Sequence, residues 1–369
     1  MEEARVNLFE RVGSSYEIGD QLGKNMLGNP QFMQMQKSDA EIFSDAQVVQ
    51  MNEMFDRYCP GLSDELRGFA EAVGASEKQL CYYAGTCLTP GCSIIAALPS
   101  LTKNGHVLVA RNYEFSHRMD DFSFGKTKVT GRYAHLGSSS MLFGRSEGIN
   151  ECGLMVGQTS CGLPVGNFAP MRKPAVIGLQ FWAVIRSLLE NCKDVDEALN
   201  AVLDMPIAYN INLVLADKTG KAVLFETFDG AKEWKQIDAT TAEQYLHSTN
   251  HAHLPKTKQL CTMVMEHSAC RYDYINKYMV RAEKLTAGDL KTLLLSEYPS
   301  GLCCHWYDEC FGTVRSMVFD VTAGTVELCW GGLADNGWTT YSFNEDFRVN
   351  SQTVHIKSEH PTFDFCKLV

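Results

Sequence analysis

The sequence predicts an α+β fold in which antiparallel sheets are covered by helices. This prediction depends on the order of the elements, because helical segments, strand-like segments, further helices and further strands follow one another along the chain. The composition supports it, since 45% of the 369 residues are hydrophobic and 21% are charged, as is usual for a globular protein. The length is enough for one large domain or two ordinary ones.

The first 91 residues are predicted to be mostly helical. Apolar residues recur every four positions at Ile18, Leu22 and Met26, which is the spacing of one face of a helix. The predicted helices cover residues 17–27, residues 45–58 before the stop signal Pro60-Gly61, and a third segment that begins at the N-cap Ser63 and ends near Gly74.

The remainder of the chain is predicted to begin with a hairpin. An apolar run follows Cys92, and Asn104-Gly105 is a strong turn signal. The predicted strands cover residues 93–98, 106–112, 153–159, 211–216, 222–227, 313–320, 325–330 and 338–343, and the predicted helices cover residues 174–190, 195–203, 272–285 and 287–295.

Charge and composition exclude several classes of partner. The net charge of −11 argues against binding to nucleic acid or to an anionic membrane surface, because both require a basic face. The longest apolar runs contain polar or charged residues, so a membrane span is not expected. The acidic N-terminus lacks the apolar run of a signal peptide. We therefore expect a cytoplasmic protein whose fourteen cysteines are reduced.

Gly91-Cys92 separates the helical part of the chain from the first predicted strand. A cysteine that leads a strand and follows glycine fits a nucleophile that becomes the N-terminus after cleavage of the bond before it. The freed α-amino group has an ordinary pKa of about 7.7–8.0, so it can act as the general base. The alternative is an ordinary turn before a core strand, and this segment alone does not exclude it.

Arg111 lies at the end of the predicted return strand, and Glu114 follows two residues after it. A hairpin folded at Asn104-Gly105 brings both residues back beside Cys92. A cation there favours the thiolate, and a carboxylate can hold the α-amine. The alternative is an exposed ion pair, which contributes less than about 1 kcal/mol.

Residues 91–115, GCSIIAALPSLTKNGHVLVARNYEF, resemble the nucleophile hairpin of choloylglycine hydrolases and penicillin acyltransferases, which are N-terminal-nucleophile enzymes. The chain is most similar to the acyl-CoA:6-aminopenicillanate acyltransferase-like branch, the C45 peptidase family, whose members carry a propiece before the nucleophile. Further family-like segments follow in the family's order: GSSYEIGDQLG at 13–23, GINECGL at 148–154, NLVLAD at 212–217, TNH at 249–251, SACRY at 268–272 and TVRSMVFD at 313–320.

The resemblance implies a four-layer αββα sandwich, with a helical propiece of residues 1–91 and a catalytic domain of residues 92–369. It implies that Cys92 is the nucleophile and that the bond from Gly91 is the one cleaved. The implied roles of the other residues are an oxyanion donor at Asn250, helped by backbone N–H groups or by Asn150, cations near the thiol at Arg111 and Arg271, and Glu114 where the family usually has Asp. A single oxyanion donor typically contributes about 3 kcal/mol or more.

The implied reaction is hydrolysis of a linear amide in an N-acyl small molecule, through a Cys92 thioester and without a cofactor. The alternative is transfer of the acyl group from an acyl-CoA or an amide to an amine. We expect an apolar or aromatic acyl group, bound by loops around residues 113–121, 160–168 and 303–311 that include Tyr113, Phe115 and Trp306. The propiece is expected to stay bound after cleavage, and a homo-oligomer is left open.

Two other kinds of protein remain as alternatives. A non-catalytic binding protein on the same fold is disfavoured by the presence of Cys92 with its expected partners. A zinc module would use Cys303, Cys304, His305 and Cys310, whose spacing matches no closed structural zinc site, so no metal is expected. A Cys–His pair that includes His251 is also disfavoured, because the free α-amine already supplies a base.

Overall fold

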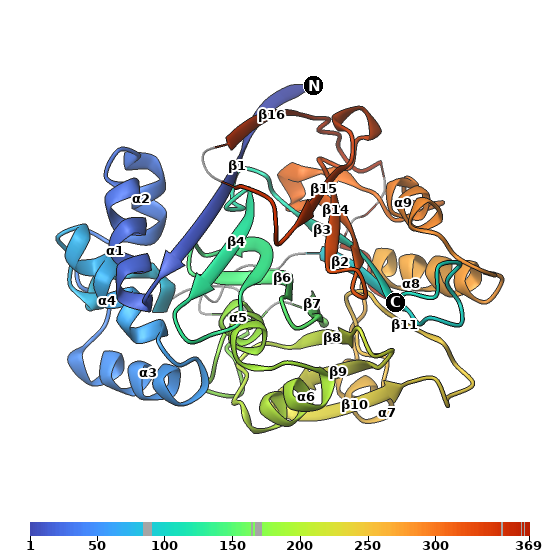
Figure 1. The fold of residues 1–369 in the computed structure, drawn as a ribbon, viewed down its shortest axis with the longest axis horizontal. Helices are drawn as coiled ribbons and strands as arrows, with labels where there is room; N and C mark the ends of the chain where they lie inside the picture. The colour runs from blue at the N-terminus through green and yellow to red at the C-terminus, as the bar shows by residue number, and fades with distance from the viewer. Residues whose placement is uncertain (84–90, 164, 167–171, 348–349, 363, 365) are drawn as a thin grey trace.

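Two stacked β-sheets form the centre of the molecule, and helices cover their outer faces (Figure 1). The computed structural model describes residues 1–83, 91–163, 165–166, 172–347, 350–362, 364 and 366–369. Apolar side chains fill the space between the two sheets, and separate apolar clusters fill the space between each sheet and its helices. The predicted α+β class and the four-layer αββα arrangement are therefore confirmed.

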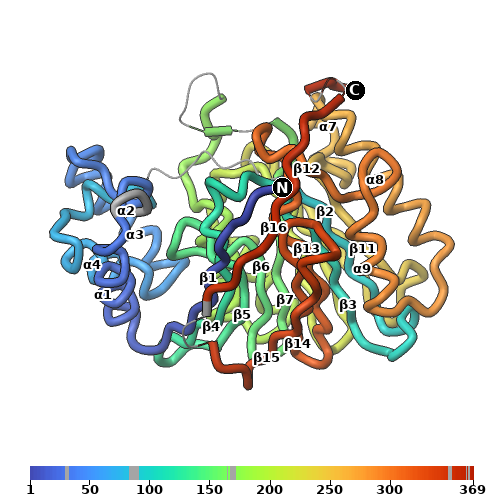
Figure 2. Tube along the Cα trace, turned by 90° about the horizontal axis from the view of Figure 1, so that it is seen from above, coloured from blue at the N-terminus to red at the C-terminus, as the bar shows by residue number. Residues whose placement is uncertain are grey.

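The first sheet has nine strands: β1 (Glu2–Gly13), β4 (Ser123–Val129), β5 (His135–Ser140), β6 (Gly144–Asn150), β7 (Leu154–Ser160), β8 (Ile211–Asp217), β9 (Ala222–Phe228), β10 (Ala231–Ile237) and β16 (Asn350–Ile356). They lie in the order β10-β9-β8-β7-β6-β5-β4-β1-β16. Neighbours are antiparallel except β1 and β4, which run parallel. Figure 2 shows β1 and β16 side by side, so the two ends of the chain meet in one sheet.

The second sheet has seven strands: β2 (Gly91–Ala97), β3 (Leu108–Phe115), β11 (Tyr245–Ser248), β12 (His305–Trp306), β13 (Phe311–Asp320), β14 (Thr325–Trp330) and β15 (Thr339–Ser342). Their order is β11-β2-β3-β13-β14-β15, with β12 against β13. Successive side chains of a strand point to opposite faces. In β2, Ile94 and Ala96 face the other sheet, whereas Ile95 and Ala97 face the helices. The strand that begins beside Cys92 is therefore buried on both faces.

The helices fall into three groups. The nine-stranded sheet is covered by α5 (Phe181–Asn191) and α6 (Val195–Asp204), with α7 (Pro255–Leu260) against its edge, and the seven-stranded sheet is covered by α8 (Glu266–Met279) and α9 (Ala287–Leu295). At one end of the molecule, beside β1, lie α1 (Ser15–Met26), α2 (Pro30–Gln36), α3 (Asp45–Tyr58) and α4 (Leu62–Ala72) (Figures 1 and 2). Short 3-10 helices cover Glu77–Gln79, Cys81–Tyr83, Tyr307–Glu309 and Ala334–Asn336. Among the described residues, no helix is both long and apolar enough to cross a membrane.

The prediction of a mostly helical propiece is correct for α1, α3 and α4 but wrong for the first residues. Glu2–Gly13 forms strand β1, which lies between β4 and β16. The third helix begins after Gly61, which has a left-handed backbone with φ of 93°, so the expected N-cap Ser63 lies inside it. The segment before Cys92 therefore contributes one strand to the nine-stranded sheet as well as the helices beside that strand.

Later elements also differ from the predictions in places. The hairpin of β2 and β3 is confirmed, but its connection spans residues 98–107, so Asn104-Gly105 is only part of a longer loop. Residues 174–180 precede helix α5 and are not helical. The predicted helices at 45–58 and 287–295 and the strand at 325–330 have the observed bounds.

Helices α1 and α4 cross at very short range because glycine lies at the crossing. A Cβ atom at Gly19 would lie 1.9 Å from the backbone oxygen of Glu65, and one at Gly68 would lie 2.4 Å from the backbone oxygen of Tyr16. Both neighbours are backbone atoms, so they cannot yield by a change of rotamer. The crossing therefore requires glycine at both positions.

We predict that Gly19→Ala lowers the free energy of unfolding by about 2 kcal/mol, because overpacking costs more than the roughly 1 kcal/mol that alanine gains in helix propensity. Denaturant unfolding of the full chain measures the change. Gly28→Ala is the control, since a Cβ atom there meets nothing within 4 Å. Equal stability of the two variants would contradict the close crossing.

Candidate active site around Cys92

Cys92 lies at the start of β2 and is completely buried. Its backbone is opposite Tyr113 of β3, so its side chain shares the face that packs on the nine-stranded sheet. Cys92 therefore has neighbours on both sides of the seven-stranded sheet. Each of its three polar atoms contacts a different residue: the sulfur contacts Arg111, the nitrogen Asn250 and the oxygen Arg271.

The thiol of Cys92 accepts a hydrogen bond from Arg111. The Nη2 atom of Arg111 lies 3.3 Å from the sulfur, and its Nε atom donates to Glu147 of β6 at 2.8 Å. Its Nη1 atom donates to the backbone oxygen of Gln158 in β7. Arg111 is on β3, so its buried guanidinium joins the two sheets at Cys92. The predicted proximity of Arg111 to Cys92 is confirmed.

The backbone nitrogen of Cys92 donates to the side-chain oxygen of Asn250 at 3.1 Å. Asn250 follows β11, and its Nδ2 atom donates to the hydroxyl of Ser160 at 2.9 Å. Its backbone nitrogen donates to the hydroxyl of Ser268 in α8 at 2.7 Å. These bonds correct the expected orientation, because the oxygen of the Asn250 amide, not its nitrogen, is directed at Cys92.

The backbone oxygen of Cys92 accepts from Arg271 of α8. The Nη1 atom of Arg271 lies 2.8 Å from that oxygen, and Nη2 lies 2.6 Å from the Asn250 oxygen. Arg271 is fully buried and lies over the ring of Phe311 at 5.0 Å. It therefore connects the Asn250 loop to Cys92, and the structure places it near Cys92 as expected.

A buried charge network extends behind Arg111. Glu147 also accepts from Nε of Arg315 in β13 at 3.3 Å, and Arg315 donates to Asp120 at 2.9 Å. Arg315 stacks on the ring of Tyr113 at 3.9 Å. Sequence reasoning missed Glu147, because its segment GRSEGIN is too rich in glycine and serine to indicate a strand. The signal in the sequence that could have found Glu147 is that this lone carboxylate directly precedes the family-like segment GINECGL.

Glu114 lies on the opposite face of β3 from Arg111. Its backbone is opposite Gly91, and its side chain accepts from Thr313 at 3.3 Å. Burial raises the pKa of Glu114 to about 7, although Arg271 and Arg111 partly offset the effect. The nitrogen of Cys92 is held by Asn250 instead, so Glu114 lies beside Gly91 without the expected contact.

Asn150 does not belong to this site. It lies at the end of β6, where its amide nitrogen donates to the backbone oxygens of Leu189 and Cys192 at 2.9 and 2.7 Å. Its oxygen accepts from the backbone nitrogens of Cys152 and Leu154. All of these contacts hold the turn and the end of α5, so the expected contribution to an oxyanion site is wrong.

The expected substrate-binding aromatic residues are buried in the intact chain. Tyr113 lies beneath Arg315, and Phe115 meets Tyr113 edge-on at 6.3 Å. Trp306 stacks on Phe311 at 6.1 Å, and a Cβ atom at Gly91 would lie 2.0 Å from the Phe311 ring. Glycine is therefore required before Cys92. In the expected loop 160–168, residues 164, 167 and 168 lie outside the described part of the chain.

The histidines and other cysteines have other partners. His251 contacts the hydroxyl of Ser268 at 2.8 Å, and Cys303 contacts His305 at 3.7 Å. Cys310 contacts the sulfur of Met119 at 3.9 Å. Across the described ranges, no group of three or more His, Cys, Asp or Glu side chains is arranged to hold a metal ion.

The environment of Cys92 keeps its thiol protonated in the intact chain. Burial raises the pKa of Cys92 to about 12, and the lowering effect of Arg111 is smaller. A thiol is a weak nucleophile compared with its thiolate. Arg111 thus places a cation beside the sulfur of Cys92, while Asn250 and Arg271 hold the nitrogen and the oxygen of the same residue. The thiol itself stays neutral.

The chain belongs to the acyl-coenzyme A:6-aminopenicillanic acid acyl-transferase family, whose family model matches residues 100–335. The matched segment is more than half of the chain. It includes Arg111, Glu114, Asn250 and Arg271 and begins after Cys92. The chain is thus an N-terminal-nucleophile protein of the amidase or acyltransferase class.

Solved structures of similar fold include hydrolases and acylases. A mutant conjugated bile acid hydrolase from Clostridium perfringens is 14% identical, with a TM-score of 0.46, over 74% of this chain and 100% of that chain. Penicillin V acylase from Agrobacterium tumefaciens is 13% identical, with a TM-score of 0.39, over 65% and 83%. The Caenorhabditis elegans ortholog of N-acylethanolamine-hydrolyzing acid amidase is 14% identical, with a TM-score of 0.42, over 63% and 93%. No curated protein sequence matches the chain.

We predict that the free energy of unfolding of Glu114→Gln rises relative to that of the parent chain as the pH increases. In the parent chain, the unfolded carboxyl ionises near its ordinary pKa of 4.5, whereas the folded carboxyl ionises only near 7. The stability that this carboxyl contributes is therefore fully present below pH 4.5 and is lost as pH rises to 7. The difference between the two proteins should grow by about 3 kcal/mol over this interval and then level off.

Denaturant unfolding at several pH values measures this difference, with both proteins carrying Cys92→Ala so that the chain stays single. Glu53→Gln is the control, because Glu53 is exposed on α3. A stability difference between Glu114→Gln and its parent that does not vary with pH would show that the buried carboxyl is ionised throughout.

Proposed function

We propose that this protein is a self-processing cysteine amidohydrolase that acts on linear amides of N-acyl small molecules. The observation that carries the proposal is the convergence of three residues on one cysteine. Arg111 contacts the sulfur, Asn250 the nitrogen and Arg271 the oxygen of Cys92. A structural cysteine has no need of two buried cations, because burying charge is costly unless it is paired. Family membership supports the same class of chemistry.

Self-processing would begin with attack of the Cys92 sulfur on the carbonyl carbon of Gly91. The carbon–nitrogen bond breaks, a thioester forms between Gly91 and the sulfur, and the thiol proton passes to the departing nitrogen. Water then hydrolyses the thioester, which leaves a carboxylate on Gly91 and a free thiol and α-amine on Cys92. The small size of Gly91, beside the Phe311 ring, supports a close approach of the reacting atoms.

In the processed enzyme, the α-amine of Cys92 would take the proton from the thiol as it attacks the substrate amide. Asn250 is suited to orient this amine, because its oxygen already accepts from the same nitrogen at 3.1 Å. Arg111 favours the thiolate from 3.3 Å. The amine product leaves with the proton, and water releases the acid from the thioester on Cys92.

Acyl transfer is the second candidate, because the activity in the name of the matching family is that of an acyltransferase. The first half of the reaction would be the same, and an amine would replace water in the second half. A mass-spectrometric screen distinguishes the two. N-acyl amino acids, N-acyl amines and bile-acid conjugates are incubated with the protein, with and without an added amine acceptor. Free acid supports hydrolysis, a new amide supports transfer, and neither product from any amide would overturn the proposed function.

We predict that the purified wild-type protein consists of two fragments, one ending at Gly91 and one beginning at Cys92. Intact-mass analysis under denaturing conditions measures their sizes. Cys92→Ala should leave a single chain without amidase activity, because the nucleophile of both reactions is lost. Cys192→Ala is the matched control, since Cys192 is also a buried free thiol and should allow both cleavage and activity. A single uncut chain with full activity would contradict the N-terminal-amine mechanism.

We expect the fragment before Cys92 to remain bound after cleavage. Strand β1 lies inside the nine-stranded sheet, between β4 and β16, and both of these strands follow Cys92 in the chain. Size-exclusion chromatography of the processed protein without denaturant should therefore give one species that contains both fragments. Separation of the two fragments under these conditions would contradict this expectation.

A further inference from the structure

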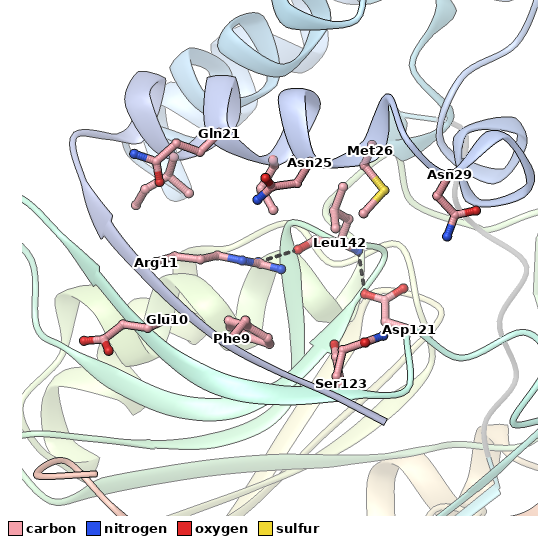
Figure 3. A pocket seen from close by; sticks show the side chains of 13 residues that line it. Phe9, Glu10, Arg11, Gln21, Asn25, Met26, Asn29, Asp121, Ser123 and Leu142 are labelled. Atoms are coloured by element: carbon pink, nitrogen blue, oxygen red, sulfur yellow. Dashed lines mark hydrogen bonds between the residues drawn. The ribbon is translucent and has the colours of Figure 1, made fainter. Parts of the chain in front are cut away.

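A cavity of about 400 Å³ lies between strand β1 and helix α1 (Figure 3). Its size is within the range of small-molecule sites. None of the residues that contact Cys92 lines it. Its lining includes Phe9, Glu10 and Arg11 of β1, Gln21 and Asn25 of α1, and Asp121. The cavity is therefore distinct from the candidate active site.

Arg11 is the charged group that dominates this cavity. Its side chain extends from β1 beneath helix α1 (Figure 3) and is only 9% exposed. Its Nη1 atom donates to the backbone oxygen of Leu142 at 2.8 Å, and the guanidinium lies 4.1 Å from the centre of the Phe9 ring. Among the described residues, no carboxylate forms an ion pair with Arg11 and none accepts from its Nε or Nη2 atoms. A buried cation without a partner is costly.

Burial with no ionic partner among the described residues makes Arg11 easier to deprotonate than a free arginine. Burial lowers the pKa of Arg11 to about 10, and the opposing effects of Glu65 and Asp121 are smaller. Glu65 is engaged elsewhere, since it forms an ion pair with Arg186. The guanidinium is therefore charged at neutral pH but poorly compensated by the protein.

The two acidic residues that line the cavity are also engaged elsewhere. Asp121 accepts from the hydroxyl of Ser139 at 2.6 Å and from the backbone nitrogen of Leu142 at 2.7 Å. Glu10 forms an ion pair with Lys126 at 2.9 Å. Neither contact uses Arg11, so the place of its counter-ion is open to a ligand.

The rest of the lining is amphipathic. Helix α1 presents the carboxamides of Gln21 and Asn25 above Arg11 (Figure 3). The same helix contributes the apolar side chains of Ile18, Leu22 and Met26. One end of a ligand can thus meet a cation and amide groups, while its other end meets hydrocarbon.

We propose that this cavity binds a small carboxylate with a short apolar chain, whose carboxylate pairs with Arg11 and whose chain lies along helix α1. The guanidinium matches a carboxylate through two parallel hydrogen bonds, and its Nε and Nη2 atoms supply the donors. The ligand contacts β1 and α1, which precede Cys92, and also Ser123 and Leu142, which follow it. It therefore links the two parts of the chain on either side of the proposed cleavage site. The proposal does not depend on catalysis.

Isothermal titration of the full chain with hexanoate tests the proposal. The protein carries Cys92→Ala, so that neither processing nor turnover affects the heat. Hexanoate should bind with a defined stoichiometry, whereas hexanamide, which has the same chain without the charge, should bind at least about tenfold more weakly. Inorganic phosphate, an anion without an apolar chain, should also bind at least about tenfold more weakly.

Three variants locate the site. Arg11→Met keeps the side-chain stem without the charge and should weaken hexanoate binding at least about tenfold. Asn25→Phe changes an exposed position of α1 and should obstruct the cavity without disturbing the core, so it tests the site if Arg11→Met fails to fold. Lys126→Met removes the neighbouring cation that pairs with Glu10 and should leave binding unchanged.

Several results would overturn the proposal. These are absence of hexanoate binding, equal binding of hexanamide or of phosphate, and unchanged hexanoate binding in Asn25→Phe. Loss of binding in Lys126→Met to the same extent as in Arg11→Met would also overturn it, because the attraction would then be a general effect of charge.

Discussion

The buried guanidinium of Arg111 is the interaction on which the arrangement of the two sheets around Cys92 depends. A charge removed from water needs acceptors for its donors, and Arg111 finds one in each of three strands: the sulfur of Cys92 in β2, Glu147 in β6 and the backbone of Gln158 in β7. These strands belong to different sheets, so the bonds fix how the sheets stack. Removal of Arg111 would leave Glu147 buried with Arg315 as its one remaining cationic partner in the described part of the chain, and breaking a buried pair typically costs about 3–5 kcal/mol.

The same burial that orders Arg111 keeps the thiol of Cys92 protonated. Desolvation of the sulfur outweighs the nearby cation, so the pKa of Cys92 is raised to about 12. The nitrogen of Cys92 is an amide in this state and cannot accept a proton. Cleavage before Cys92 would convert it to an amine at the position where Asn250 already accepts from it. Cleavage would therefore supply a general base by converting one backbone amide nitrogen to an amine. Arg111, Asn250 and Arg271 would already be in position around it.

The sequence allowed the β2–β3 hairpin and the proximity of Arg111, Asn250 and Arg271 to Cys92 to be predicted, because these depend on local signals and on ordered motifs. Arg111 is two residues before Tyr113, which lies opposite Cys92, so a hairpin alone brings it close. Strands β5 and β6 escaped prediction because HLGSSS and GRSEGIN are poor in β-branched and aromatic residues, and Glu147 was missed with them. The direction of the Asn250 amide depends on Ser160 and Arg271, which are distant in sequence, so only the folded structure reveals it.

The residues on the two sides of Gly91–Cys92, the proposed cleavage site, pack together as one unit. Strand β1 pairs with β4 and β16, and Glu65 of α4 forms a buried ion pair with Arg186 of α5, where Nη1 lies 2.9 Å from Oε1. Loss of the N-terminal fragment would expose the edges of β4 and β16. Among the described residues, it would leave Glu190 as the remaining acidic partner of Arg186. An exposed sheet edge invites pairing with other chains, and a broken buried pair is costly. Both effects would favour retention of the fragment if the chain is cleaved as proposed, so the segment before Cys92 is an integral part of the fold.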